Sequence, residues 1–219
     1  PEGALIPVLA LLLLRQLYVL AGLGDAKDLI DVLSLSLGYY HEDPDDHLED
    51  APLRLVLQEL GRLGVAVVAS AGNQTTTEPL YPAAFSGQTE LPFDPHRVPL
   101  VSVGALNPDG TVAYFSNDGP WVGCWRPGAA IISTMPTDIV GELQPRAKLT
   151  YDGHVRSTID PDRFKGGFGA WSGTSFAGPV LAGQLAARLA EDPSLASVDE
   201  DAAVKRAWRA VHAEVGWRP

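Results

Sequence analysis

A serine at the mouth of a predicted helix and an asparagine at the end of a predicted strand are the residues best suited to chemistry. Ser175 follows Gly173-Thr174, where glycine permits a sharp turn. A helix N-terminus would place its hydroxyl oxygen beside positive N–H groups. Asn73 ends the small-residue run Ala69–Gly72, and its side-chain amide can donate to an oxyanion. Both residues are therefore suited to stabilising negative charge.

The elements around these residues predict an α/β fold. Residues 31–37 form an expected strand that ends at Gly38, 50–64 an expected helix, and 65–69 a short apolar strand. This order is a βαβ unit, so the sheet should be parallel, and its strands should end on the same side as Asn73. The pattern also indicates strands at 99–105, 112–115 and 129–134, a long loop insertion at 136–170, and helices at 175–190 and 197–217 with Ser197 as N-cap.

Composition narrows the class of protein. The chain has 219 residues, which suggests a single domain over 1–219. Its 16 Lys and Arg against 27 Asp and Glu give a net charge of -11, which argues against a nucleic-acid partner. Residues 4–14 are apolar but shorter than the roughly 20 residues of a membrane span, so no membrane partner is expected. The lone Cys124 is expected to pack, because no histidine lies near it in sequence.

Several segments, taken in order, resemble the subtilisin-like serine proteases (peptidase family S8). These are Ser36-Leu37-Gly38, Ala71-Gly72-Asn73, Val101–Ala105 followed by Ala113–Gly119, Trp125–Gly128 with Ile131–Thr134, and Gly173-Thr174-Ser175. The resemblance covers residues 30–190. It implies a three-layer fold, in which helices flank a parallel sheet, and serine endopeptidase activity on peptide or protein substrates.

The resemblance also implies roles for single residues. Ser175 would be the nucleophile, and Asn73 together with the Ser175 backbone N–H would hold the oxyanion. The residues that would bind substrate are Ser36, Leu37, Gly38, Ala71, Gly72 and Thr174. Tyr81-Pro82-Ala83 either borders the substrate pocket or forms a plain turn.

The resemblance does not extend to the two residues that would activate Ser175. An activated serine needs a base and an orienting carboxylate, which this family carries upstream in Asp-Ser/Thr-Gly and His-Gly-Thr motifs. None of the five histidines is followed by glycine; they are His41, His47, His96, His154 and His212. Three alternatives remain open. The N-terminal part of the domain is missing and supplies both partners, or the chain is an inactive pseudo-protease that binds peptides, or His154 has been recruited.

The segment 41–50 contains six acidic residues and two histidines. Its oxygens could bind calcium, which subtilisin-like proteases often hold, but the spacing matches no known metal motif, and a solvated acidic loop is favoured. No metal site or cofactor is therefore assigned. The segment follows Gly38, so it should rim the substrate groove and favour basic substrates. The sequence does not indicate a compartment.

Overall fold

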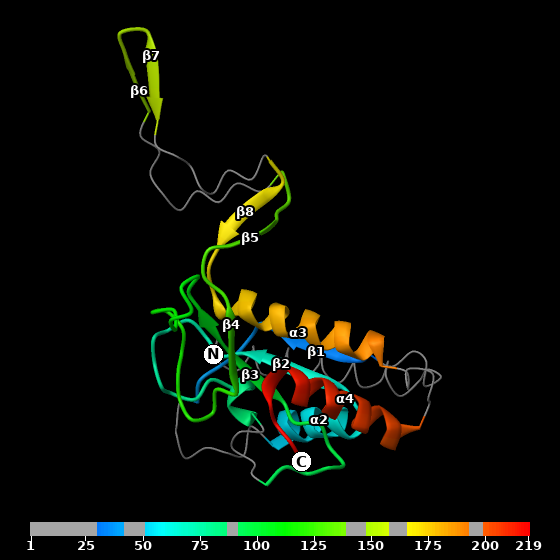
Figure 1. Cartoon of the computed structure of the whole chain (residues 1–219). Helices are drawn as coiled ribbons and strands as arrows, with labels where there is room; N and C mark the ends of the chain where they lie inside the picture. Colours follow the sequence, from blue (N-terminus) through cyan, green and yellow to red (C-terminus); the bar gives the residue numbers. More distant parts are fainter. Residues whose placement is uncertain (1–29, 42–50, 87–91, 139–147, 158–165, 193–198) are drawn as a thin grey trace.

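The computed structural model describes residues 30–41, 51–86, 92–138, 148–157, 166–192 and 199–219. Its centre is a sheet of four parallel strands in the order β1-β2-β3-β4 (Figure 1). The strands are β1 (Val32–Leu35), β2 (Ala66–Ser70), β3 (Val101–Leu106) and β4 (Cys124–Pro127). Because all four run in one direction, their carboxyl ends meet at one edge of the sheet.

Helices cover both faces of the sheet and create two hydrophobic clusters. The helices are α2 (Ala51–Arg62), α3 (Thr174–Glu191) and α4 (Glu200–Val215), with a short 3₁₀ helix η2 (Ala83–Phe85). In β2, Val67 belongs to the cluster of α2, and Val68 belongs to that of α3 and α4. Successive strand residues point to opposite faces, so β2 is buried on both sides. The predicted three-layer α/β fold is confirmed, as are the strands near 31–37, 65–69 and 99–105 and the helices near 50–64 and 175–190.

Two of the predicted strands differ in the structure. Residues 112–115 are not a strand: Val112 makes one isolated bridge to Leu106, and the Ser116 N–H donates to the carbonyl of Ala113 in a turn. The segment 129–134 contains β5 (Ile131–Thr134), which lies outside the central sheet and pairs antiparallel with β8 (Phe168–Trp171). The neighbour of β3 is β4, whose mixed sequence carries little apolar periodicity.

The connection 136–170 contains regular structure where a loop was expected. Strands β6 (Lys148–Tyr151) and β7 (His154–Ser157) form an antiparallel hairpin that Figure 1 shows extended away from the sheet. Asp152 and Gly153 both have positive φ, as a two-residue hairpin turn requires. The Asp-Gly pair was the available sequence signal for this hairpin.

The C-terminal helix begins later than the predicted boundary of 197. The N-cap of α4 is Asp199 rather than Ser197, and its side chain makes no capping hydrogen bond. The helix ends at Gly216, whose φ of 84° suits a left-handed C-cap. Trp217 lies beyond the helix and is buried in the same cluster as Trp208.

Some predictions concern residues outside the described ranges. These are the apolar stretch 4–14 and the acidic segment 42–50. Within the described part of the chain, every helix is too short or too polar to cross a bilayer.

Replacing Leu181 by alanine should lower the free energy of unfolding by about 2–5 kcal/mol. Leu181 lies in α3 and is fully buried in the α3–α4 cluster, so truncation leaves a cavity beside the sheet. Urea unfolding of the full-length protein measures the change. Leu55→Ala is the control, because Leu55 is 61% exposed on α2 and should change stability by less than about 0.5 kcal/mol. Equal losses in both variants would contradict this packing.

Candidate active site

Three chain segments meet at the carboxyl edge of the sheet. They are the residues after β1, the loop after β2, and the first turn of α3. Ser36 Oγ donates to the Ser175 carbonyl at 3.4 Å, and Ser70 Oγ donates to the Thr174 carbonyl at 3.0 Å. These bonds fasten the first turn of α3 to the ends of two neighbouring strands. Residues 139 positions apart in sequence are thereby brought into contact.

The side chain of Asn73 is held in one orientation by Thr174. Its Oδ1 accepts from the Thr174 backbone N–H at 2.8 Å and from Thr174 Oγ1 at 3.0 Å. Thr174 Oγ1 in turn accepts from the Gly72 N–H at 3.0 Å. With Oδ1 engaged, the Nδ2 end of the amide is turned away from Thr174, and it makes no hydrogen bond to any described residue. Asn73 is exposed, so this donor can reach a ligand.

Ser175 lies in the first turn of α3 and is half-buried. The N–H groups of a first helical turn have no partner within the helix, and the helix dipole is positive at this end. Gly173 precedes the helix in an extended conformation, and its N–H donates to the carbonyl of Gly128. Ser175 therefore combines a hydroxyl with a backbone donor at the edge where Asn73 also lies.

The structure places the other predicted substrate-binding residues in two groups. Ser36, Leu37 and Gly38 follow β1 and belong to no ladder in the described chain, so their backbone groups lie beyond the strand pairing. Ala71, Gly72 and Thr174 are buried beneath the Asn73 loop. The first group is thus positioned to pair with an added strand. The second group supports the loop.

Next to Gly38 the chain forms an aromatic cluster. Tyr39 and Tyr81 exchange two backbone hydrogen bonds of 2.8 and 2.9 Å, and a cis peptide bond joins Tyr81 to Pro82. The ring of His41 stacks on Tyr81 with centroids 4.2 Å apart. The segment 81–83 therefore lies beside residues 38–39, and its place at the border of a substrate pocket stays a prediction.

No described histidine contacts Ser175. Its Oγ makes no hydrogen bond within the described residues, and His154 lies on the extended β6–β7 hairpin (Figure 1). His96 is in the turn before β3, and His212 is on α4. In the described residues, the Ser175 hydroxyl therefore lies at the edge where Asn73 also lies, without a histidine hydrogen-bonded to it. Among these same residues no cluster of His, Cys, Asp or Glu could hold a metal ion.

Asn117 is a site residue that the sequence reasoning missed. It is fully buried, and its Nδ2 donates to the carbonyl of Ala71 at 2.9 Å while its Oδ1 accepts from the Gln74 N–H at 2.9 Å. It therefore contacts the loop on both sides of Asn73. The only available signal was its place in the Ser-Asn-Asp-Gly turn, which does not reveal a contact more than 40 residues away.

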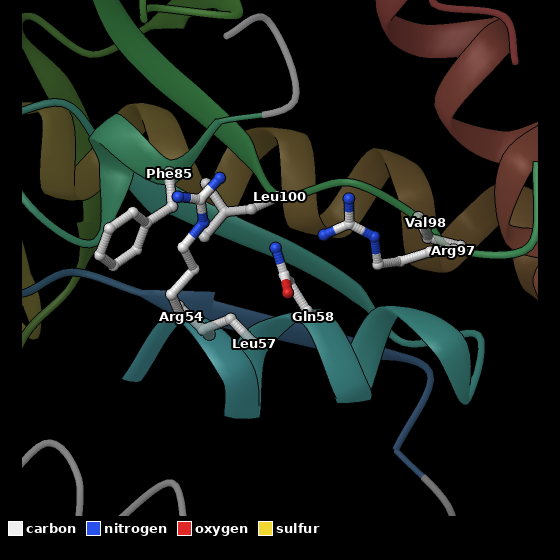
Figure 2. Close-up of a pocket in the computed structure, with 7 residues that line it drawn as sticks. All are labelled: Arg54, Leu57, Gln58, Phe85, Arg97, Val98 and Leu100. Carbon is white, nitrogen blue, oxygen red and sulfur yellow. The ribbon is translucent and has the colours of Figure 1, made fainter. Parts of the chain in front are cut away.

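A depression lies away from this edge, between α2 and the segment before β3 (Figure 2). Arg54, Leu57 and Gln58 reach into it from α2, with Phe85 from η2. Arg97, Val98 and Leu100 complete the lining. It contains no serine, histidine or carboxylate, so the groups suited to acyl transfer are at the sheet edge instead.

Replacing Thr174 by valine should destabilise the site at nearly constant side-chain volume. The variant loses the hydroxyl bond to Asn73 Oδ1 and leaves the buried Gly72 N–H without an acceptor. An unsatisfied buried donor costs about 1–3 kcal/mol, which urea unfolding measures. Thr174→Ser keeps the hydroxyl and is the matched control. Unchanged stability in the valine variant would show that these bonds contribute nothing.

Cys124 should react slowly with alkylating reagents. It lies in β4, where burial raises the pKa of its thiol to about 11. The thiolate is the reactive species, so at pH 8 the rate with iodoacetamide should be about 100-fold below that of an unperturbed thiol. The unfolded chain in urea is the reference. Because the unfolded thiol ionises near pH 9 and the folded one near 11, this group's contribution to stability falls between those values. Equal rates for folded and unfolded protein would contradict the burial.

Comparisons with known proteins identify relatives that share this fold. A sequence model described as the subtilase family matches residues 14–217. Serine protease AprX of Bacillus subtilis (strain 168) is 30% identical over 190 residues, which cover 76% of this chain and 35% of that protein. Subtilisin E of the same organism is 27% identical over 166 residues, which cover 75% of this chain and 32% of that protein. The chain thus spans about a third of the length of these curated relatives.

Solved structures show the same architecture. The prenylagaramide maturation protease PagA superposes with a TM-score of 0.55 at 21% identity, over 86% of this chain and 53% of that one. A lanthipeptide protease superposes with a TM-score of 0.56 at 18% identity, over 80% and 49%. The family match extends over both strand ends and the first turn of α3, where Asn73 and Ser175 lie. The chain belongs to the subtilase family.

Proposed function

We propose that this chain carries the nucleophile and the oxyanion-binding groups of a serine endopeptidase. The observation that carries the proposal is the fixed orientation of Asn73, whose Oδ1 accepts two hydrogen bonds from Thr174 at 2.8 and 3.0 Å. A donor that is oriented before the substrate arrives stabilises developing negative charge without reorganisation. The adjacent Ser175 supplies the hydroxyl that would attack.

The reaction proceeds through an acyl-enzyme. Ser175 Oγ bonds to the peptide carbonyl carbon while its proton passes to a histidine base, and the carbonyl oxygen becomes an oxyanion. Asn73 Nδ2 and the Ser175 backbone N–H donate to this oxygen. As the C–N bond breaks, the histidine returns the proton to the departing amine. Water then attacks the ester by the same route and releases Ser175.

The histidine and its orienting aspartate belong to residues outside this chain in the proposed enzyme. The proposal is supported by the absence of any histidine contact to Ser175 in the described residues. The substrate would extend along Ser36, Leu37 and Gly38 as an added strand, where backbone hydrogen bonds provide affinity. Its class is a peptide or protein, with no cofactor in the reaction.

Labelling with a fluorophosphonate probe tests the proposal, because the probe forms a covalent bond only with an activated serine. Residues 1–219 alone and a longer form containing an Asp-Ser/Thr-Gly and a His-Gly-Thr motif are compared, with Ser175→Ala as control. We expect label on the longer form only, at Ser175. Label on residues 1–219 alone would mean that a resident histidine acts as base. No label on either form would leave a peptide-binding pseudo-protease.

A further inference from the structure

Asn117 lies buried beneath the loop that carries Asn73, and all four hydrogen-bonding positions of its side chain are used. Its Nδ2 donates to the Ala71 carbonyl at 2.9 Å and to the Tyr40 hydroxyl at 2.8 Å. Its Oδ1 accepts from the N–H groups of Gln74 at 2.9 Å and Thr76 at 3.4 Å. An asparagine amide has two donors and two acceptor lone pairs, so the residue is saturated.

The backbone around Asn117 fastens the same loop. The Asn117 N–H donates to the Gly72 carbonyl at 2.9 Å, and the Thr75 N–H donates to the Phe115 carbonyl at 3.1 Å. The Asp118 N–H donates to the Thr76 carbonyl at 3.0 Å. The turn at 115–118 is thus joined to the loop on both sides of Asn73, and none of these backbone bonds goes to Asn73 itself.

A second connection leads from Asn117 to Asn73 through two side chains. The Tyr40 hydroxyl, which accepts from Asn117 Nδ2, donates to Gln74 Oε1 at 2.9 Å. Gln74 Oε1 also accepts from the Asn73 backbone N–H at 2.9 Å. The Asn73 backbone is therefore held through Gln74 and Tyr40, and its side chain is held by Thr174.

The space that Asn117 occupies explains the glycine at position 72. A Cβ built on Gly72 would lie 2.4 Å from Asn117 Nδ2, and the φ of Gly72 is +102°. A side chain at position 72 would have to displace the Asn117 amide and adopt an unfavourable backbone conformation. Gly72 and Asn117 thus form one packing unit below the loop.

We propose that Asn117 is a positioning residue for the Asn73 oxyanion donor. The inference rests on the proposed function. In it, the 115–118 turn fixes the position and orientation of the 71–76 loop. Asn117 touches no reacting atom in this role. A displacement of about 1 Å in an active-site donor can cost on the order of 100-fold in rate.

Asn117→Asp is the sharpest test, because it keeps the shape and the acceptor oxygen but loses both Nδ2 donors. In the longer form that contains the Asp-Ser/Thr-Gly and His-Gly-Thr motifs, we expect kcat to fall about 10- to 100-fold with KM changed less than about twofold. Asn107→Asp is the matched control: Asn107 bonds to Thr111 in a turn after β3 and contacts none of the loop residues in the described structure. Its kcat should stay at the wild-type value.

A double-mutant cycle separates positioning from independent effects. If Asn117 acts through Asn73, Asn117→Asp should lower kcat little further in an Asn73→Ala background. An equal fold-loss in both backgrounds, or no loss in the wild-type background, would overturn the proposal. If Asn117→Asp does not fold, Tyr40→Phe is the second variant, because it removes the hydroxyl that joins Asn117 to Gln74. It should lower kcat by a smaller factor, and this effect should also disappear in the Asn73→Ala background.

A readout without catalysis distinguishes failure of this inference from failure of the proposed function. The Asn73 side-chain NH₂ signals, assigned by their loss in Asn73→Ala, should show a lower heteronuclear NOE in Asn117→Asp than in Asn107→Asp. If the wild-type protein neither hydrolyses peptides nor labels at Ser175, the proposed function fails while this measurement still decides the positioning role. Unchanged NOE values would exclude that role.

Discussion

Replacing Ser175 by alanine in the longer form that contains the Asp-Ser/Thr-Gly and His-Gly-Thr motifs should lower kcat for peptide hydrolysis by on the order of 10⁶-fold. The variant loses the hydroxyl that acts as the nucleophile in the proposed mechanism, so no acyl-enzyme can form at this position. The methyl group of alanine fits the half-buried first turn of α3, so the fold should be retained. Initial rates with a peptide substrate measure the loss, and circular dichroism confirms that the protein is folded.

Ser172→Ala is the matched control for this prediction. Ser172 lies three residues before Ser175, where its Oγ accepts from the Ala130 N–H at 2.9 Å and it is exposed. Its removal should change kcat by much less than the removal of Ser175. A Ser175→Ala variant that still hydrolyses peptides or still takes up the phosphonate probe would place the nucleophile elsewhere and refute the proposed mechanism.

Periodicity predicted the buried centre of the fold because burial on both faces leaves an unambiguous pattern. Residues 65–69 are wholly apolar, and all but the first of them lie in β2, between the two clusters. The same reasoning failed for 112–115, where a short apolar run turns back after β3 because its Ala113 N–H donates to Ala105. It also gave no sign of β4, which only the resemblance at Trp125–Gly128 indicated and whose residues are half-buried or exposed. Local apolarity does not determine pairing when only one face is covered.

The proximity of Asn73 to Thr174 and Ser175 could be predicted from the sequence. Parallel strands end at one edge, so residues after β1 and β2 must lie near each other. The resemblance to the subtilisin-like proteases predicted that the first turn of α3 lies at the same edge. The saturated role of Asn117 could not be predicted, because its bonds go mostly to backbone groups, whose positions the sequence does not specify. The orientation of the Asn73 amide likewise depends on which atom Thr174 engages. The sequence identified the residues, whereas the distances assign the donor and acceptor ends.

Asn73→Asp should lower kcat about 10²- to 10³-fold while leaving KM nearly unchanged. Aspartate keeps an oxygen where Oδ1 accepts from the Thr174 N–H and Oγ1, so the loop geometry should survive. The other end of the side chain changes from an N–H donor to a negatively charged oxygen. It would then repel the oxyanion that it normally stabilises. Steady-state kinetics on a peptide substrate separate the two constants.

Asn73→Ala provides the contrast that makes this prediction specific. Alanine removes the donor and also leaves the Thr174 N–H and hydroxyl without their acceptor, so it should lower the free energy of unfolding where aspartate does not. Both variants should lose kcat, but only alanine should lose stability. If Asn73→Asp retains wild-type kcat, Nδ2 does not contact the transition state. If aspartate lowers stability as much as alanine does, an acceptor oxygen at position 73 does not stabilise the fold, and the bonds from Thr174 do not hold the loop.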